Sequence, residues 1–340
     1  MTGFKNIYSI GEIASAHDGN LSEIKKLLDI YSNNGFDFIK LQIFKLDDLI
    51  NTLDEVNSPL KDIEISKKNW EEIFNYISIN KNKFSKTKYI AEPYDLSSLE
   101  LCKEFDIFDA YKLPTSDLSN INLIEKILKY TKNIFLGTGG STLKEITKSI
   151  NFIKVNYPDV KYRLIHGFQA YPTDIKDMDL WKISYLKNTF SCEVGFADHA
   201  DASSSILRFL PSCMAVSYGA NFIEKHITIN RSEKKPDYYS SLNPEEVENF
   251  FLAISHASEL SKDESFYDLS ENEKFYRKSM KKFACTITRI AKGEKFTSNK
   301  ITFKRSTKGE YSLFDLDFLV GKIASKDLFP GHTILEEDIL

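Results

Sequence analysis

The sequence predicts an α/β protein, built as a (β/α)8 TIM barrel with a small β-rich domain after it. Two observations carry this prediction. Apolar runs of strand length alternate with helical patterns from the N-terminus to about residue 260, and beyond that point short strands and turns replace the alternation. Strict alternation over about 250 residues is typical of a closed barrel. A doubly wound open sheet is the alternative that the same alternation allows.

Eight strand candidates, each followed by a helix candidate, occupy the first part of the chain. In the first helical segment Leu21, Ile24, Leu27 and Leu28 recur at helical spacing, and Gly35 follows its end. Ser66 is expected to cap the second helix. Strands are expected at 7–14, 36–44, 89–92, 110–113, 134–137, 162–167, 192–196 and 220–227, and helices at 21–34, 66–84, 95–105, 119–131, 141–156, 176–187, 202–218 and 243–260.

The last third of the chain predicts a second domain. Residues 263–282 are highly charged and suit a linker or a connecting helix, whereas 283–340 contain short strand patterns and turns. Two segments there, "RIAKGEKFTSNKI" and "DLFPGHTILEEDI", resemble each other, because each has a glycine turn, a threonine and a polar or acidic start of a closing helix. We therefore expect a barrel at 1–262, a linker at 263–282 and a small domain at 283–340.

Composition excludes several classes of function. A net charge of −4 gives no electrostatic case for binding nucleic acid or an anionic membrane. No apolar run approaches the roughly 20 residues that span a bilayer, and the N-terminus enters a strand pattern without a signal peptide. The four cysteines are scattered and form no CxxC pair, which is typical of reduced thiols. We expect a cytoplasmic protein.

Polar side chains gather at the C-terminal ends of the predicted strands, where barrel enzymes have their active sites. Lysines, carboxylates and histidines would converge there on one face, and together they suit the binding of an anion and a metal ion. These residues are Glu12, His17, Lys40, Gln42, Glu92, Lys112, Thr115, Asp117, Thr138, His166, Gln169, Tyr171, Asp198, His199, Glu224 and His226.

The pair His199 and His226 predicts a metal site. A single histidine at a strand end is more often a hydrogen-bonded structural residue, but these two follow the adjacent seventh and eighth strands. Neighbouring strands lie about 5 Å apart, which is within reach of one ion. Neutral imidazoles completed by water suit Mn²⁺, Fe²⁺ or Zn²⁺.

Lys40 and Lys112 lie inside apolar runs, where an unpaired ammonium group is costly to bury. A phosphate or carboxylate ligand is one explanation, and a buried ion pair with Glu12 or Asp117 is the other. The glycine-rich segment "GTGGST" opens a helix and could hold a phosphate through its N–H groups, although alone it is a weak signal.

These segments resemble the sialic acid synthase family, in the right order and over nearly the whole chain. "EIASAHDG" resembles the family's EIGxNHxG, "AYKLPTSD" its YKIxSGE, and "LGTGGSTLKEI" its STGMxTxxEI. "LIHGFQAYPTDIKDMDL" resembles LLHCTSxYPTxxEDxNL, "VGFADHAD" resembles GYSDHT, and "GANFIEKHITIN" resembles GAxxIEKHFTLD. The tail resembles the antifreeze-protein-like (SAF) domain that closes these synthases.

The resemblance implies a C–C bond-forming transferase. The family joins phosphoenolpyruvate to an open-chain N-acetylated amino sugar, giving a nine-carbon 2-keto-3-deoxy acid and phosphate. It implies a divalent metal on His199 and His226, most simply Mn²⁺ with Mg²⁺ or Co²⁺ as alternatives, and a proton-handling role for Glu12. Lys40 and Lys112 match the cations that hold phosphoenolpyruvate. Further substrate-binding positions are Gln42, Glu92, Thr115, Asp117, Thr138, Gln169, Tyr171, Asp198, Asp237 and Arg305.

Arg305 matches an arginine that the terminal domain of one subunit inserts over the barrel of its partner. The resemblance therefore implies a homodimer with a swapped C-terminal domain, in which the sugar is capped in trans.

The chain departs from the family in the expected phosphate cradle. Gly137 and Ala197 replace serines, Thr115 replaces another serine, and Glu92 replaces the usual serine or threonine of the third strand. Each lost hydroxyl is worth roughly 1.5–3 kcal/mol toward a charged acceptor. A carboxylate at Glu92 would also repel a phosphate unless a cation pairs with it.

Two alternatives follow from these departures. The first is an aldolase or lyase that acts on a 2-keto sugar acid without phosphoenolpyruvate, with Lys112 forming a Schiff base. The second is a catalytically silent homologue that binds a sugar as a partner or regulatory subunit.

Overall fold

The computed structural model describes residues 7–50, 60–261 and 269–340. Its first unit, residues 1–262, contains eight parallel strands that close into a barrel, because β8 pairs with β1 and every other strand pairs with its neighbour in the chain. The predicted (β/α)8 barrel is confirmed. The strands are β1 Tyr8–Glu12, β2 Phe38–Ile43, β3 Lys88–Pro93, β4 Ala110–Leu113, β5 Asn133–Gly137, β6 Lys161–His166, β7 Val194–Asp198 and β8 Phe222–His226.

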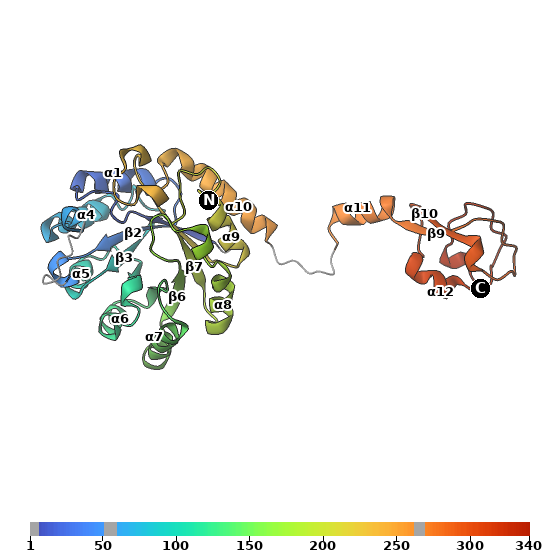
Figure 1. Ribbon diagram of the computed structural model, residues 1–340, viewed down its shortest axis with the longest axis horizontal. Helices are drawn as coiled ribbons and strands as arrows, with labels where there is room; N and C mark the ends of the chain where they lie inside the picture. The colour runs from blue at the N-terminus through green and yellow to red at the C-terminus, as the bar shows by residue number, and fades with distance from the viewer. Residues whose placement is uncertain (1–6, 51–59, 262–268) are drawn as a thin grey trace. The chain divides into compact units, whose positions relative to one another are not determined.

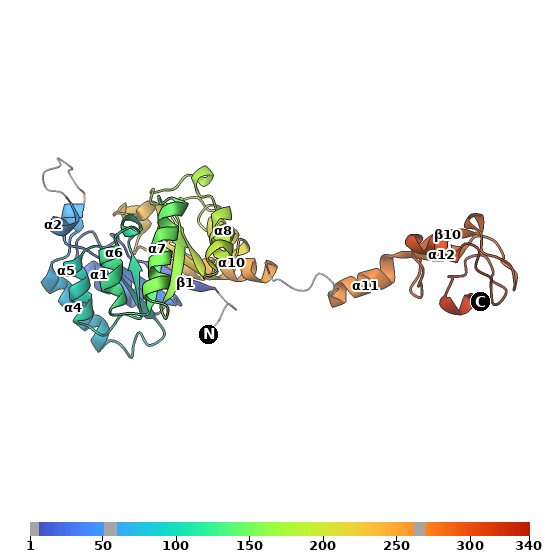
Figure 2. The ribbon, with the colours of Figure 1, turned by 90° about the horizontal axis from the view of Figure 1, so that it is seen from below.

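Helices surround the strands (Figures 1 and 2). Each long helix buries an apolar stripe against the barrel, as Ile24, Leu27 and Leu28 of α1 do. Ser66 caps α4 by accepting from the backbone N–H of Asn69, as its position predicts. The helices of this unit are α1 Leu21–Tyr31, α2 Leu46–Leu49, α3 Leu60–Ile63, α4 Lys67–Ile79, α5 Leu96–Lys103, α6 Ile121–Leu128, α7 Leu143–Asn156, α8 Trp181–Phe190, α9 Leu210–Ser217 and α10 Val247–Leu260.

The helix predicted at 202–218 starts later than expected, since α9 begins at Leu210. The preceding residues form turns in which side chains take backbone donors. Asp201 accepts from the N–H of Ser203 at 2.8 Å, and the Ser204 hydroxyl accepts from the N–H of Leu207 at 3.2 Å. These local bonds compete with helical ones, which explains the late start.

The barrel interior is layered. Alternate residues of a strand point to opposite sides, so each strand contributes every second side chain to the inside. An apolar group fills the barrel interior below the site, and two of its members, Ile165 and Ala197, reach the pocket wall. The group consists of Ile10, Ile90, Ala110, Phe135, Ile165, Ala197 and Phe222. Phe135 packs edge-on against both Phe38 and Phe222. Two residues further along β1, β2, β3, β4 and β8 the inward positions become charged, and the site begins there.

The second unit, residues 263–340, has its own small core, made of Ala284, Ile290, Phe296, Ile301, Leu319, Ala324, Leu328 and Ile334. β9 Lys282–Thr286 and β10 Ile301–Arg305 pair antiparallel, and α12 spans Leu316–Leu319. The expected linker at 263–282 lies partly outside the described residues, and its later part contains α11 Glu271–Met280.

The two similar segments of the second unit have matching local structure. Ile290 and Leu328 form a bridge, and three residues after each comes a glycine turn. Gly293 and Gly331 have φ angles of 81° and 86°, a left-handed conformation that only glycine adopts without strain. The sequence repeat therefore corresponds to a structural one.

No described helix is both long enough and apolar enough to cross a bilayer. The four cysteines are all free thiols, as their scatter predicts.

Tyr31 links α1 to the segment after β8. Its buried hydroxyl lies 2.6 Å from the carbonyl oxygen of Thr228 and 2.9 Å from that of Leu242, and donates to them. We expect Tyr31→Phe to lower the free energy of unfolding of the barrel by about 1–2 kcal/mol, because two buried carbonyls lose their shared donor. Urea denaturation measures it. The control Tyr185→Phe, on an exposed ring of α8, should change it by less than about 0.5 kcal/mol. Equal effects would contradict this account.

Candidate active site

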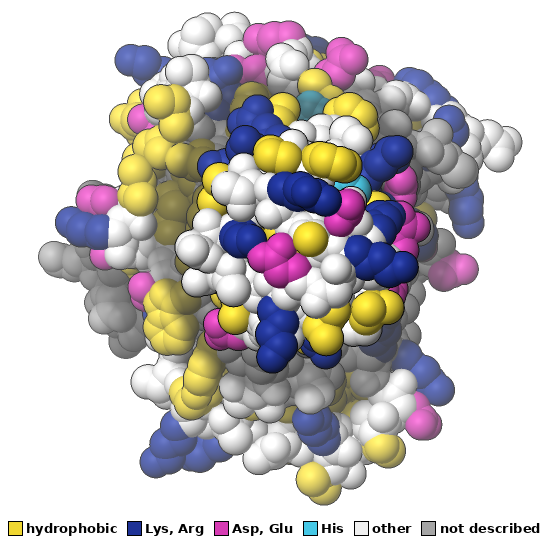
Figure 3. All heavy atoms as spheres, turned by 90° about the vertical axis from the view of Figure 1, so that its right-hand side faces the viewer, with side chains coloured by type: hydrophobic (Ala, Val, Ile, Leu, Met, Phe, Trp, Pro, Cys, Tyr) yellow, Lys and Arg dark blue, Asp and Glu magenta, His cyan; other side chains and the backbone are white. Residues whose placement is uncertain are grey.

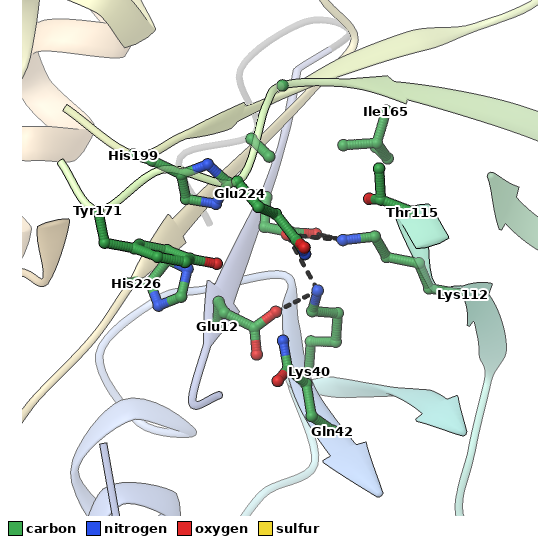
Figure 4. A pocket seen from close by; sticks show the side chains of 13 residues that line it. Glu12, Lys40, Gln42, Lys112, Thr115, Ile165, Tyr171, His199, Glu224 and His226 are labelled. Atoms are coloured by element: carbon green, nitrogen blue, oxygen red, sulfur yellow. Dashed lines mark hydrogen bonds and ion pairs between the residues drawn. The ribbon is translucent and has the colours of Figure 1, made fainter. Parts of the chain in front are cut away.

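A pocket opens at the C-terminal ends of the barrel strands, on the face that the sequence predicts (Figure 4). It is narrow, with a volume of about 10 Å³, roughly the space of one water molecule. The pocket is lined by Glu12, Lys40, Gln42, Lys112, Thr115, Ile165, Gly167, Gln169, Tyr171, Ala197, His199, Glu224 and His226. Nine of the predicted site residues are among them.

Five charged side chains from five strands form a buried charge cluster at the pocket floor: Lys40, Lys112, Glu12, Glu92 and Glu224. None is more than 4% exposed. The Glu224 carboxylate accepts from Lys40 at 3.0 Å and from Lys112 at 2.8 Å and 3.0 Å. Lys40 also pairs with Glu12 and, at 2.6 Å, with Glu92. Figure 4 shows Lys40 and Lys112 pointing toward Glu224.

The cluster shows that the strand lysines form buried ion pairs. Lys40 forms the ion pair with Glu12 that the sequence allows, whereas Lys112 pairs with Glu224 and, at 3.5 Å, with Glu92 rather than with Asp117. Both lysines also line the pocket, so they are paired with carboxylates and at the same time accessible to a ligand.

Burial and pairing compete at Lys112. Burial lowers the pKa of Lys112, but the carboxylates of Glu224 and Glu92 outweigh it and hold that pKa above its usual value. Burial raises the pKa of Glu224, and Lys112 and Lys40 more than reverse this, so that carboxyl stays ionised. A lysine that keeps its proton is a poor nucleophile, which argues against the Schiff-base alternative.

His199 and His226 lie together beside the charge cluster, with ring centroids 5.2 Å apart. The Tyr171 ring packs edge-on against both, with centroids 4.9 Å and 5.3 Å away. Burial lowers the pKa of His199 to about 4, and burial together with the neighbouring His199 holds the pKa of His226 well below its usual value. Both imidazoles are therefore neutral at pH 7, the form that binds metals.

The histidine pair fits a divalent cation. The Nδ1 of His199 lies 2.9 Å from the carbonyl oxygen of Phe168. A carbonyl only accepts, so that nitrogen carries the proton and Nε2 keeps a free lone pair, the usual arrangement of a metal-binding histidine. The Nδ1 of His226 is buried without a hydrogen-bond partner among the described residues. The part of the chain that the structure describes offers no group of three or more such ligands, so water or substrate would complete the shell.

Six predicted site residues do not line the pocket. Glu92 lies in the charge cluster, and Arg305 lies on β10 of the second unit. Asp117 accepts from Ser116 and Asn120 within its own turn, and Thr138 donates to the carbonyl oxygen of Ile165. Asp237 accepts from the N–H of Ser15 at 3.1 Å and lies 4.0 Å from Nδ1 of His226, beside the histidine pair.

The sixth, Asp198, has a different place from the predicted one. Its carboxylate lies 3.1 Å from Nζ of Lys225 and accepts from the Ser212 hydroxyl at 2.5 Å and from the N–H of Ala200 at 2.9 Å. Asp198 and Lys225 are both completely buried. The side chain of Asp198 therefore braces the ends of β7 and β8 instead of facing the pocket, one residue before each pocket histidine.

Gly137, at the end of β5, is explained by Thr115, which follows the adjacent strand β4. A Cβ at this position would lie 2.3 Å from the hydroxyl oxygen of Thr115 and 3.0 Å from its Cα. The Thr115 side chain thus occupies the space that a serine at 137 would need. Restoring a serine there would displace Thr115, so Gly137 belongs to the local packing of the pocket wall.

Glu224 stands at a strand end and lines the pocket, but it is not among the catalytic, substrate-binding or metal residues that the sequence predicts. The signal was present, because Phe222, Glu224 and His226 alternate along β8 and share one face. A strand that places His226 in the pocket also places Glu224 inside the barrel.

Fold and site together define a (β/α)8-barrel protein whose mouth suits an anion and a divalent cation. The NeuB family matches residues 27–265, more than half of the chain. The N,N'-diacetyllegionaminic acid synthase of Campylobacter jejuni is 28% identical over 98% of this chain and 100% of its own length. The pseudaminic acid synthase of C. jejuni serotype O:23/36 is 29% identical over 98% and 97%.

A solved structure has the same fold. The N-acetylneuraminic acid synthetase of Leptospira borgpetersenii superposes with a TM-score of 0.69 at 22% identity, over 82% of this chain and 93% of that one. The chain described here belongs to the NeuB family, as the resemblance of its motifs predicts.

The bracing pair behind the histidines gives a stability prediction. We expect Lys225→Met to lower the free energy of unfolding by about 3 kcal/mol, because it leaves the Asp198 carboxylate buried without its counter-ion. Urea denaturation of the barrel measures it. Lys148→Met, an exposed control on α7, should cost less than about 0.5 kcal/mol. An unchanged free energy in Lys225→Met would show that the pair is not needed.

Proposed function

We propose that this chain is a nonulosonic acid synthase. It condenses phosphoenolpyruvate with an open-chain N-acetylated hexosamine, N-acetylmannosamine or a modified relative, to a nine-carbon 2-keto-3-deoxy acid and phosphate. The observation that carries the proposal is the meeting of two buried lysines and two neutral histidines in one pocket of a NeuB-family barrel. The names of the relatives support a modified hexosamine of the legionaminic or pseudaminic type.

The reaction places two demands on the pocket. C3 of phosphoenolpyruvate forms a bond to the aldehyde carbon of the sugar, water adds to C2, and the resulting tetrahedral centre releases phosphate by C–O cleavage. Cations must hold the carboxylate and phosphate of phosphoenolpyruvate, and a carboxylate must accept a proton from water. The ammonium groups of Lys40 and Lys112 and the carboxylate of Glu12 are the groups in the pocket suited to these roles.

Glu12 is well oriented for proton transfer. One of its oxygens accepts from the N–H of Ala14 at 2.7 Å, and the other pairs with Lys40, so the carboxylate is held from two sides. Gln42, Thr115, Gln169 and Tyr171 line the rest of the pocket and are suited to hydrogen-bond a polyhydroxylated sugar.

His199 and His226 would hold the divalent cation, for which we propose Mn²⁺. Bound there, it would act as a Lewis acid toward the sugar aldehyde. The chain's own contribution is to keep both imidazoles neutral and oriented, through burial, the Phe168 carbonyl and the edge of Tyr171.

The second unit is proposed to act as an SAF-type cap on the barrel of a partner subunit in a domain-swapped homodimer. Hydrophobic and basic side chains are interspersed on the face of this unit seen in Figure 3. Leu313, Phe314, Phe318 and Phe329 are each more than half exposed, which supports a role in contacts with another chain.

The direct test measures phosphate release from phosphoenolpyruvate with a panel of N-acetylated hexosamines and with Mn²⁺. Release that needs both the sugar and the metal supports the proposal. Sugar binding without turnover would favour a silent homologue. Pyruvate formed from a nonulosonic acid, with an adduct trapped by borohydride, would favour the lyase.

The histidine pair gives a metal prediction. His199→Ala and His226→Ala should each abolish turnover and reduce Mn²⁺ affinity by at least about a hundredfold, as loss of a ligand does. Calorimetric titration and phosphate release measure both, with circular dichroism as the check on folding. His256→Ala, an exposed histidine of α10, is the matched control and should bind and turn over normally. Normal metal binding in either pocket variant would rule out this metal site.

Arg305 gives a prediction about the cap. Arg305→Ala should raise the sugar KM by about tenfold or more and change kcat less, because one charged hydrogen bond to the sugar is lost. Lys304→Ala, its exposed neighbour on β10, is the control. Mixed dimers of Arg305→Ala with Glu12→Gln should regain sites with the wild-type KM, since an intact barrel then meets an intact cap. No regain would contradict capping in trans.

A further inference from the structure

The charge cluster is electrically unbalanced. Two lysine ammonium groups face three carboxylates, so the cluster carries a net charge of −1 when all five groups are ionised. All five side chains are buried, where uncompensated charge is costly and charges act strongly on one another. An anionic substrate must bind directly above this surplus of negative charge.

Glu92 is the carboxylate that makes the surplus. Glu224 accepts hydrogen bonds from both lysines, and Glu12 accepts one from the backbone of Ala14. Glu92 accepts no hydrogen bond of either kind, from a lysine or from the backbone, among the described residues. Its oxygens lie 2.6 Å from Nζ of Lys40 and 3.5 Å from Nζ of Lys112. Without Glu92 the cluster would hold two positive and two negative groups.

Glu92 differs from the two lysines in its access to the pocket. It is completely buried and is not a lining residue, whereas Lys40, Lys112 and Glu224 all line the pocket. An ammonium group has three donors, and Lys40 already faces three carboxylates. A ligand anion must therefore share lysine charge that Glu92 partly neutralises from within the barrel.

We propose that Glu92 is a positioning residue that sets the affinity of the pocket for anions and selects against high ligand charge. It acts through Lys40 and Lys112, without touching the ligand. This inference deepens the proposed function, because it concerns the affinity for phosphoenolpyruvate, but it applies to any anion that binds these two lysines. The repulsion is Coulombic, so a dianion is penalised twice as much as a monoanion in free energy.

The experiment measures binding without turnover. Inorganic phosphate, mainly a dianion at about pH 8, and pyruvate, a monoanion, are titrated calorimetrically into the full chain and into Glu92→Gln and Glu92→Asp. Glu92→Gln should bind phosphate about tenfold more tightly and pyruvate about threefold more tightly, since the free-energy gain scales with ligand charge. Glu92→Asp keeps the negative charge and should stay within about threefold of the wild type for both.

Folding is checked by thermal unfolding. Glu92→Gln leaves a balanced cluster and should unfold at or above the wild-type temperature. Adding Lys112→Met to Glu92→Gln should remove the gain in phosphate affinity, because the anion then loses its cation.

Three results would overturn the inference. The first is that Glu92→Gln binds phosphate no more tightly than the wild type does. This includes the case in which neither protein binds phosphate. An equal gain for phosphate and pyruvate is the second, since it would indicate a change of shape and not of charge. The third is that Glu92→Asp gains as much phosphate affinity as Glu92→Gln does. Failure of the proposed function is separate, because it would appear as missing sugar-dependent phosphate release in the wild type.

Discussion

The carboxylate of Glu224 receives hydrogen bonds from Lys40 and Lys112 at the centre of the barrel, and the rest of the site is arranged around this contact. It joins β8 to β2 and β4, strands far apart in the sequence. Charged groups so deeply buried are tolerable only when they are paired. At Lys112 the paired carboxylates outweigh burial and hold the pKa above its usual value, so this amine stays in the charged form that can bind an anion.

The closed barrel makes this arrangement feasible. Alternate strands supply the side chains of each interior layer, so Lys40, Lys112 and Glu224 enter from even-numbered strands, while Glu12 and Glu92 enter from odd-numbered ones. Below them the apolar group around Phe135 and Phe222 excludes water from the underside. The charge cluster thus lies between this apolar group and the narrow opening of the pocket. Electrostatic interactions there are stronger than in water.

The histidines depend on a second buried ion pair. Asp198 and Lys225 each stand one residue before a pocket histidine and point to the opposite side of their strand. Their contact fixes the relative position of β7 and β8 where His199 and His226 emerge. The two buried ionic groups therefore differ in what they do. The charge cluster presents charged side chains to the pocket, whereas the Asp198–Lys225 pair aligns the strand ends that carry the two neutral histidines.

The sequence by itself determined the barrel, the order of its strands, the separate second unit and the pocket position of the two histidines. These follow from local periodicity and from motifs whose residues lie close together in the chain. Only the tertiary structure decided that Glu224 pairs with both lysines, that Glu92 pairs with them without lining the pocket, and that Asp198 turns away from the pocket. A shift of one residue along a strand reverses the side that a side chain faces. The partner of a buried charge depends on the register between strands that are distant in sequence, and no local pattern encodes that register.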